Sequence, residues 1–502
     1  MTHFLGIDIG TFESKGVLVA ADGAVVAQAA APHKMIVPRP GWAEHRPDED
    51  WWGDFVTLTR QLLAAIRIDP HDIAAVACSA IGPCMLPVGP DGEPLMNGVL
   101  YGVDTRAAAE IDELTERIGA GTLMARCGNA LTSQSVGPKI LWLKHNRPGL
   151  YDRAQMFLSA TPYLVYRLTG EYVIDHYTAA GFTPLYDVAK LDWDDDLARG
   201  IVERHRLPRL LWTSEIAGAV TGRAAAETGL AAGTPVTCGA IDAASEAVSV
   251  GVTGAGDMML MYGSTVFVIL ITQRQVGDPR LWYAPWLFPG THASMSGLAT
   301  SGTLTRWFAD NFARDLAPTE VMPRLAEEAA SSPRGAKGVI VLPYFSGERT
   351  PIHDPRAKGC IFGLDLTHTR ADVYRGVIEG IGYAVRHIIE TYEDVGQPPH
   401  RLIAVGGGTR NPAWLAAVSD ICGYPQVLRR TSTGASYGNA FLGAVSTGHA
   451  QLADIERWNA AVKVQEPDAA TRGLYDRQYA IYKALYLQTR ELMAQLSQSA
   501  AG

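Results

Sequence analysis

Short apolar runs that end at polar or glycine-rich corners are the main pattern near the N-terminus of this chain. The alternation predicts three strands, at residues 4–9, 15–20 and 24–30. Asp22 and Gly23 lie between the second and third runs, and an Asp-Gly pair at this place is typical of a tight hairpin. The first run instead reaches an acidic residue and a Gly-Thr corner, and the chain then turns straight back into the second strand.

The same strand–corner–strand pattern returns at residues 256–272, where a Gly-Ser-Thr corner at 263–265 separates two apolar runs. Single hydrophobic cores stop growing near about 250–300 residues, so a chain of 502 residues is expected to form two large domains. The repeat predicts domains at residues 1–247 and 248–502, with one ligand cleft between them.

Helical periodicity and buried strands alternate through the rest of the chain, which predicts an α/β fold. Pro138 is expected at the start of a helix. The expected helices are residues 48–66, 105–118, 138–146 and 474–496. The expected strand and strand-to-helix units are residues 73–80, 231–252 and 401–423.

Composition narrows the class of protein. The chain is 47% apolar and 19% charged, and its net charge of −9 without a Lys/Arg-rich block argues against nucleic acid as a partner. The six cysteines include no CxxC pair, so we expect reduced and mostly buried thiols. We recognise no signal peptide and no apolar stretch long enough to span a bilayer, and therefore expect a cytoplasmic protein with no membrane partner.

The first corner has the composition of a phosphate site, because backbone amides can approach an anion where no side chain interferes. We expect the amides of Gly10, Thr11 and Phe12 to face a phosphate, with Asp8 at the strand end beside them. A carboxylate repels phosphate, so Asp8 implies Mg²⁺ between the two. A strand and not a helix follows Gly10, which excludes the dinucleotide-binding fingerprint, and no P-loop motif is present. An ordinary glycine turn is the alternative.

A second corner and a third glycine cluster favour a nucleotide. The corner at 263–265 again lies between two strands, so two hairpins could hold one polyphosphate from both sides. The three glycines at 406–408 end a strand and precede Asn411 and Pro412, and bare backbone there would let a base or ribose lie flat. Three such clusters in this order predict a nucleotide between two domains.

Longer motifs resemble those of one known family. They are GIDIGT (6–11), GWAEHRPDEDWW (41–52), YGVDTRA (101–107), KILW (139–142), LPYFSGERTPIHDPRAKGCIFGL (342–364) and AVGGGTRNPAWLAAVSD (404–420). Together they resemble the FGGY family of carbohydrate kinases, closest to its xylulokinase-like members, from residue 4 to residue 450. The resemblance implies two actin-like (ribonuclease-H-like) domains with an interdomain catalytic cleft, in which the first domain mainly holds a sugar and the second mainly holds ATP.

The resemblance also implies roles for matching residues. Asp8 would hold Mg²⁺ through water, and Asp242 would be the catalytic base that takes the proton of the attacking sugar hydroxyl. The residues expected to bind ATP are Gly10, Thr11, Lys15, Gly263, Ser264, Gly302, Gly407, Gly408 and Asn411. General chemistry agrees, because phosphoryl transfer from ATP needs a carboxylate near the hydroxyl and Mg²⁺ near the transferring group.

Two aspartates leave a structural alternative open. Asp242 follows Gly239 and opens a helix, so capping is the alternative to a catalytic role. Asp104 lies between an apolar strand and a helix, where it could cap the helix or, as the resemblance implies, contact the hydroxyls of the sugar. The resemblance implies that Glu348 and Arg349 are structural or lie near the interdomain hinge, and we leave them out of catalysis.

The identity of the sugar is the point at which this chain departs from the xylulokinases. Those usually carry Met-His-Gly where this chain has Gly82, Pro83 and Cys84, and they follow the catalytic aspartate with Asn where this chain has Ala243. Gly82, Pro83 and Asp242 are still expected at the substrate. Losing hydrogen-bonding side chains relaxes selectivity or changes the sugar. D-xylulose is the first expectation, and another ketopentose, a tetrulose or a polyol are the alternatives.

Two other classes of function compete with a sugar kinase. A sugar-independent ATPase of the actin or chaperone type would carry a peptide-binding or polymer-forming appendage, which we do not recognise. A non-catalytic sugar-binding regulator would lose Asp8 or Asp242, and both are present. Dimers are common in the family, so the resemblance allows a homodimer, although no motif specifies an oligomeric state or an allosteric effector.

Overall fold

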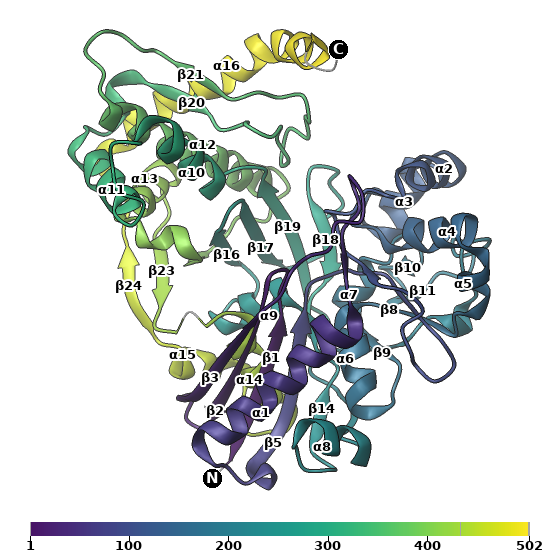
Figure 1. The fold of residues 1–502 in the computed structure, drawn as a ribbon. Coiled ribbons are helices and arrows are strands. Elements are labelled where there is room, and N and C mark those ends of the chain that lie inside the picture. The colour runs from purple at the N-terminus through teal and green to yellow at the C-terminus, as the bar shows by residue number, and fades with distance from the viewer. Residues whose placement is uncertain (1, 432, 500–502) are drawn as a thin grey trace.

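The structure is a computed structural model that describes residues 2–431 and 433–499. It is built around two seven-stranded sheets, one in each half of the chain (Figure 1). The first half matches the predicted strands closely, and the strand expected at residues 73–80 is β5 with the same bounds. The expected helix at 48–66 divides into a π-helical turn, Pro47–Gly53, followed by α1, Asp54–Ile66.

The first sheet has the order β13-β14-β5-β1-β2-β3, with β15 also paired to β5. Its strands are β1 (His3–Ile9), β2 (Glu13–Ala20), β3 (Val25–Pro32), β5 (Ile73–Ala80), β13 (Ile216–Ala219), β14 (Pro235–Thr237) and β15 (Ala240–Ile241). The first three form an antiparallel meander, β1, β5 and β14 are parallel, and β13 is antiparallel at the edge. The parallel strands therefore end at the same edge as the corner after β1.

The second sheet has the order β18-β19-β17-β16-β22-β23-β24. Its strands are β16 (Asp257–Tyr262), β17 (Val266–Thr272), β18 (Trp282–Pro285), β19 (His292–Leu298), β22 (Arg401–Val405), β23 (Gln426–Arg429) and β24 (Ala461–Gln465). It repeats the first plan, with an antiparallel meander, three parallel strands and an antiparallel edge strand. The predicted duplication and the two-domain α/β fold are confirmed, while the boundary between residues 247 and 248 stays a prediction.

Helices and short strands pack around the first sheet, and a lobe of helices stands to one side of it (Figure 1). After α1, the helices of the first half are α2 (Ala108–Ile118), α3 (Ala120–Cys127), α4 (Val136–Asn146), α5 (Pro148–Arg153), α6 (Ala160–Thr169), α7 (His176–Ala180), α8 (Gly222–Thr228) and α9 (Asp242–Ser249). The short strands are β4 (Glu44–His45), β6 (Leu86–Val88), β7 (Gly98–Val99), β8 (Met156–Leu158), β9 (Val173–Asp175), β10 (Tyr186–Asp187), β11 (Asp192–Trp193) and β12 (Arg209–Leu211). Pro138 is the third residue of α4 and not its first, which corrects that detail of the expected helix.

The second half carries the longest helices of the described chain. Its helices are α10 (Gly302–Phe312), α11 (Val321–Ser331), α12 (Arg370–Asp394), α13 (Pro412–Cys422), α14 (Ala435–Ser446), α15 (Ile455–Trp458) and α16 (Arg472–Ser499). The two strands outside its sheet are β20 (Ile340–Leu342) and β21 (Cys360–Phe362). Within the described ranges, no helix has the length and apolar content needed to cross a membrane. All six cysteines are free thiols, and five of them are buried, as expected.

Helix α14 belongs to the second half of the sequence but lies against strands β1 and β5 of the first sheet and against helix α9 (Figure 1). A Cβ atom at Gly6 would overlap the backbone of Ser436, and one at Gly438 would overlap the backbone of Ser245. The side-chain amide of Asn439 donates to the carbonyl of Ile7 at 2.7 Å. This close packing fixes the two halves to one another beside the end of β1.

Candidate active site

In the first corner, residues 10–12 between β1 and β2, every backbone carbonyl accepts a hydrogen bond from a histidine. The carbonyls of Gly10 and Thr11 accept hydrogen bonds from His33 Nε2 at 3.0 Å and from His45 Nε2 at 3.1 Å. The carbonyl of Phe12 accepts from the backbone amide of His33 at 3.0 Å. The C=O and N–H of a trans peptide point in opposite directions, so the amides of Thr11 and Phe12 face away from the histidines.

One expectation about this corner needs correction. The amide of Gly10 donates to the carbonyl of Glu13 at 3.2 Å, a hydrogen bond within the hairpin, and is therefore not available to a ligand. The corner therefore offers the amides of Thr11 and Phe12 to an anion and not three amides in a row.

The second corner, residues 263–265 between β16 and β17, is supported by the first turn of α10. The Gly263 carbonyl accepts from the amide of Gly302 and the hydroxyl of Ser301, both at 3.0 Å. The Ser264 carbonyl accepts from the amides of Ser301 and Thr303 at 3.0 and 3.1 Å, and from the Thr303 hydroxyl at 2.6 Å. By the same peptide geometry, the amides of Ser264 and Thr265 face away from α10.

Gly302 lies beside the second corner as expected, but its amide supports the corner. A Cβ atom at this position would stand 2.5 Å from the carbonyl oxygen of Gly263, so only glycine allows the close approach. The first amides of α10 are already bonded to the corner, and its N-terminus is therefore a support for residues 263–265.

Asp8 is at the end of β1, where its Oδ1 accepts from the hydroxyl of Ser79 at 2.7 Å. The hydroxyl of Ser79 in turn accepts from the side-chain amide of Asn439 at 2.8 Å. Loss of hydration raises the pKa of Asp8 to about 6, although the hydrogen bond from Ser79 and the charge of Lys15 act in the opposite direction. The ammonium of Lys15 is 3.2 Å from Glu13, and both side chains are about half exposed.

Asp242 is the first residue of α9, and Ile241 holds the N-cap position. Its Oδ1 accepts from the adjacent amide of Ala243 at 2.7 Å, so the capping alternative in its usual form is not observed. Loss of hydration, then the negative charge of Asp8, raises the pKa of Asp242 to about 8. A carboxyl group with a pKa this close to neutrality is suited to accepting a proton.

Glu246 is a neighbour that the sequence analysis missed. It lies one turn after Asp242 on α9, and burial followed by the charge of Asp8 raises its pKa to about 7. The four-residue spacing was the available signal, because side chains at i and i+4 share one face of a helix.

The residues at the end of β1 fit a hydrated Mg²⁺ ion. Within residues 2–431 and 433–499, no group of three or more His, Cys, Asp or Glu residues could hold a metal directly. Mg²⁺ commonly keeps several waters and binds through one or two carboxylates and the phosphates of a substrate. Asp8 has one carboxylate oxygen engaged by Ser79, and like-charged Asp242 and Glu246 nearby would be stabilised by a divalent cation.

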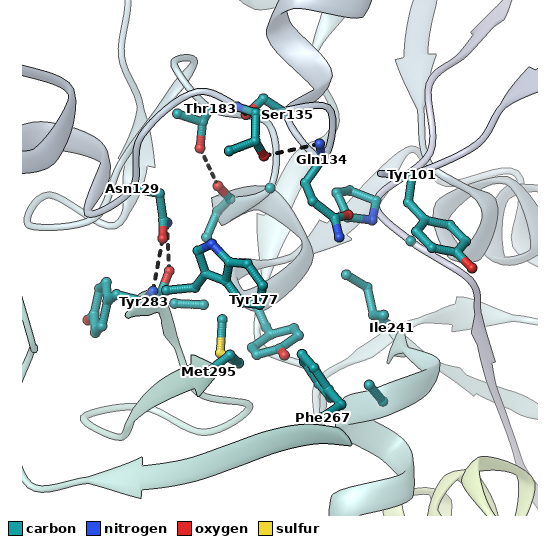
Figure 2. Close-up of a pocket in the computed structure, with 18 of the residues that line it drawn as sticks. Tyr101, Asn129, Gln134, Ser135, Tyr177, Thr183, Ile241, Phe267, Tyr283 and Met295 are labelled. Atoms are coloured by element: carbon teal, nitrogen blue, oxygen red, sulfur yellow. Dashed lines mark hydrogen bonds between the residues drawn. The ribbon is translucent and has the colours of Figure 1, made fainter. Parts of the chain in front are cut away.

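A cavity of about 300 Å³ lies between the two halves (Figure 2). Asp242 is one of the residues that line it. Gly82 and Pro83 also line it, as expected for sugar-binding residues. The second half contributes Thr265, from the second corner, together with Phe267, Trp282, Tyr283, Met295 and Arg349. The cavity therefore reaches from the predicted sugar-binding loop to a predicted phosphate corner.

Two hydrogen bonds between a side-chain amide and a backbone peptide connect the two halves at the edge of this cavity (Figure 2). The Asn129 side chain donates through Nδ2 to the Tyr283 carbonyl at 2.8 Å, and its Oδ1 accepts from the Tyr283 amide at 2.9 Å. Asn129 follows α3 in the first half, whereas Tyr283 lies in β18 of the second. The pair joins the two halves next to the cavity and had no signal in the sequence.

Asp104 does not reach the cavity. It is fully buried, and its oxygens accept from the amide of Ala43 at 2.7 Å and from the guanidinium of Arg106 at 2.7 to 3.0 Å. The guanidinium of Arg106 lies over the indole of Trp42, 3.9 Å from the ring centre. These contacts order the loop before α2, and a sugar contact for Asp104 has no geometric support.

Arg349, which the sequence analysis left out of catalysis, lines the cavity. The buried carboxylate of Glu348 accepts from the amides of Ala299 and Arg349, both at 2.7 Å, and so fixes the backbone of the loop. The Arg349 side chain is exposed in the cavity wall, and no described carboxylate forms an ion pair with it. The YFSGERTP motif was the signal, but only the tertiary fold assigns the two charges to different tasks.

The third glycine cluster forms a 3-10 turn, Gly407–Arg410, after β22. Asn411 caps α13 by accepting from the amide of Trp414 at 3.1 Å. A Cβ at Gly408 would stand 2.7 Å from the ring of Trp414, whereas the space beside Gly407 is open. The open backbone is compatible with a flat ligand, and the nucleotide contacts of these residues stay a prediction.

Two copies of one sheet plan, with a cavity between the two halves and a hairpin corner in each, define a two-domain α/β protein of the actin-like class. Family models agree: residues 3–249 match the N-terminal domain, and residues 258–447 the C-terminal domain, of the FGGY family of carbohydrate kinases. The chain belongs to this family. It is an enzyme that phosphorylates a sugar, with ATP as its second substrate.

Known relatives extend over nearly the whole chain. The xylulose kinase of Escherichia coli (strain K12) is 30% identical and covers 98% of this chain and 100% of its own length. The crystal structure of the xylulose kinase from Rhodospirillum rubrum superposes with a TM-score of 0.92 at 30% identity, covering 98% of this chain and 99% of the other. The gluconokinase of Bacillus subtilis (strain 168) is 25% identical and covers 89% of this chain and 88% of its own. The chain is thus similar to kinases with different substrates.

Proposed function

We propose that this enzyme transfers the γ-phosphoryl group of ATP to D-xylulose and forms D-xylulose 5-phosphate. The observation that carries this proposal is the position of Asp242, in the wall of the cavity that also contains Thr265 of the second corner. A carboxylate with a raised pKa thus stands between the expected sugar and the expected phosphates. The xylulose kinases of E. coli and R. rubrum support the choice of sugar.

In this proposal each residue has a defined task. Asp242 accepts the proton of the attacking hydroxyl as the oxygen bonds to the γ-phosphorus. The outward amides of the two corners hold the phosphate oxygens, and Asp8 holds Mg²⁺ through water. Mg²⁺ held at Asp8 would supply positive charge that offsets the charge of the phosphates. Closure of the two halves around the cavity keeps water from competing with the sugar hydroxyl.

A sugar acid is the second candidate substrate, because of one specific observation. Arg349 places a cation in the wall of the cavity that forms no ion pair with any carboxylate of residues 2–431 and 433–499, and an arginine is suited to binding a carboxylate. The B. subtilis gluconokinase, which is also similar to this chain, gives this candidate a precedent. Gly82 and Pro83 offer no side-chain hydrogen bond to select between the two substrates.

The test is ADP release with Mg·ATP and a panel of D-xylulose, other ketopentoses, tetruloses, polyols and D-gluconate. We expect D-xylulose to give the highest kcat/KM. Replacement of Asp242 by Asn should lower kcat by about 10²- to 10⁴-fold, the usual contribution of a general base. Equal ADP release with and without sugar would contradict the proposal, as would full activity of Asp242→Asn. A preference for D-gluconate that disappears in Arg349→Gln would establish the second candidate instead.

The pH profile gives a second check. Asp242 must be ionised to accept a proton, and its pKa is raised to about 8. The sugar kcat/KM should therefore fall as the pH drops through that value, and it should rise between about pH 6 and about pH 9. An acid limb near pH 4, where an aspartate with an ordinary pKa of about 3.9 titrates, would show that the pKa of the catalytic carboxyl is not raised in the working enzyme.

A further inference from the structure

Two histidine side chains stand directly behind the first corner. His33 follows β3, and His45 ends β4, and their rings meet edge to face with centres 4.9 Å apart. Their Nε2 atoms are the ones that hold the carbonyls of Gly10 and Thr11. Neither histidine was singled out from the sequence, although His45 lies within the GWAEHRPDEDWW motif.

The hydrogen-bond partners of His45 define its tautomer. The indole N–H of Trp51 can only donate, and it lies 3.1 Å from Nδ1, so Nδ1 carries no proton. The Thr11 carbonyl can only accept, so Nε2 carries the proton. His45 is therefore a neutral imidazole. Burial, and then the charge of His33, lowers its pKa to about 4.

The partners of His33 require both of its nitrogens to donate. Nε2 faces the Gly10 carbonyl, and Nδ1 is 2.8 Å from a carboxylate oxygen of Asp54. Neither oxygen can donate, so His33 is an imidazolium cation paired with Asp54. The hydroxyl of Ser14 also donates to Asp54, at 2.6 Å. Burial opposes this charge, but the hydrogen bond and the negative charge of Asp54 outweigh it and raise the pKa of His33.

This arrangement controls the direction of the peptide groups at the corner. Each histidine holds a carbonyl of the corner, and the amide of the same peptide unit must then point to the opposite side, away from the histidines. The imidazolium also polarises the Gly10–Thr11 peptide and places a positive charge one hydrogen bond behind it. A phosphate in front of the corner would meet two aimed amides and a nearby cation.

We propose that His33 and His45 are positioning residues for the phosphates of the nucleotide. His45 orients the amide of Phe12, and the imidazolium of His33 orients and polarises the amide of Thr11. This inference rests on the proposed use of the first corner as a phosphate site. It adds that the corner depends on two side chains from outside the hairpin. It also makes the affinity for nucleotide phosphates dependent on pH.

The sign of that dependence follows from the groups around His33. Asp54 of α1, Asp50 of the π-helical turn and His45 of β4 face it, and Asp50 is also paired with Arg46 at 2.6 Å. Because the pKa of His33 is raised in the fold, its charge is present at lower pH and is lost as the pH rises through that value. Affinity for Mg·ADP should weaken along the same alkaline limb.

The first experiment compares two replacements of His45 by calorimetric titration with Mg·ADP. Leu removes both hydrogen bonds and should weaken binding roughly tenfold, since the Thr11 carbonyl loses its donor and the peptide can turn. Gln retains an oxygen for Trp51 and an N–H for Thr11, so His45→Gln should restore most of the affinity. The KM for the sugar should change little in either variant. His71→Gln, at an exposed histidine distant from the corner, is the control.

The second experiment removes the charge of His33 without leaving Asp54 unpaired. The double variant His33→Gln/Asp54→Asn keeps an N–H for Gly10 and is neutral. We expect weaker Mg·ADP binding below the pKa of His33, and a flat pH dependence where the wild type loses affinity on the alkaline side. Thermal unfolding of each variant, with and without sugar, checks that the fold is intact. If His45→Leu does not fold, the double variant carries the test alone.

The two proposals fail in distinguishable ways. If the variants bind Mg·ADP like the wild type over the whole pH range while Asp242→Asn abolishes phosphorylation, the histidines have no positioning role and the kinase mechanism stands. If the wild type releases ADP without any need for sugar, the proposed function itself is wrong. Equal losses of nucleotide and sugar affinity in His45→Leu and His45→Gln would indicate a general structural role and would also overturn the inference.

Discussion

At the first corner, imidazole N–H groups hold the carbonyls of Gly10 and Thr11, whereas at the second corner the first turn of α10 holds the carbonyls of Gly263 and Ser264. Both arrangements leave two amides that face away from the groups supporting the corner. The second support consists of backbone amides and hydroxyls, which do not titrate near neutral pH. The first contains a charged histidine and a neutral one, so two equivalent hairpins have supports of different chemistry.

A second difference lies on the strands that lead into the corners. Asp8 is two residues before Gly10, and Met261 is two residues before Gly263. Only the first corner therefore brings a carboxylate for a cation. The comparison teaches that the two halves share the hairpin and its outward amides, while the carboxylate proposed to hold Mg²⁺ and the histidines that support the corner occur at the first corner.

The largest expected effect tests the asymmetry of Asp8 and Met261. Asp8→Asn should weaken the apparent affinity for Mg²⁺ by roughly 10- to 100-fold, as for loss of an outer contact to a metal. Met261→Leu, which conserves volume, should leave it unchanged. The measurement is a Mg²⁺ titration of sugar phosphorylation, together with calorimetric binding of ADP with and without Mg²⁺. Equal effects of the two variants would show that the corners share the cation.

The next effect tests the backbone support of the second corner. In Gly302→Ala, the new methyl group would stand 2.5 Å from the Gly263 carbonyl and must displace it. We expect a cost of about 1–3 kcal/mol and a rise of roughly tenfold or more in the KM for Mg·ATP, without the pH dependence expected from the first corner. Gly121→Ala, on α3 with open space around it, is the control. An unchanged KM for Mg·ATP would show that the second corner does not contact the nucleotide.

A smaller effect tests how the two halves of the chain are held together beside the cavity. Asn129→Ala removes both hydrogen bonds to Tyr283 at the rim of the cavity. We expect the KM for the sugar to rise by about fivefold, because two exchangeable hydrogen bonds at the weak end of the range, about 0.5 kcal/mol each, together contribute about 1 kcal/mol. Asn146→Ala, which removes a bond within α4, should have no such effect. A change confined to the KM for ATP would place the role of Asn129 at the nucleotide instead.

The smallest effect tests redundancy in the second support. Thr303→Val removes the hydroxyl that donates to Ser264, but two backbone amides continue to donate to the same carbonyl. The KM for Mg·ATP should rise by about twofold or less, the scale of about 0.5 kcal/mol for a weak net hydrogen bond. Thr303→Ser should be indistinguishable from the wild type. A loss as large as that in Gly302→Ala would show that the hydroxyl, and not the backbone, holds the corner.

Local patterns predicted the scaffold well. The alternation of apolar runs and glycine corners placed β1, β2, β5, β16 and β17, and their recurrence predicted the duplicated sheet. Asp242 was placed on the first turn of a helix next to the cavity, and Gly82 and Pro83 in its wall. The strands and corners follow from residues that are adjacent in sequence, where side-chain period and turn chemistry govern the backbone. The places of Asp242, Gly82 and Pro83 at the cavity were instead implied by the resemblance to the FGGY family.

The sequence by itself thus determined two hairpin corners, an acidic residue beside one of them and a candidate base at the start of α9. Only the tertiary structure decided that Gly10 uses its amide inside the hairpin, that Asp104 binds Arg106, and that Arg349 faces the cavity. It also brought two histidines behind the first corner. The reason is physical: a hydrogen bond between distant segments depends on how whole sheets and loops pack, and no local period records which carbonyl a distant side chain will meet.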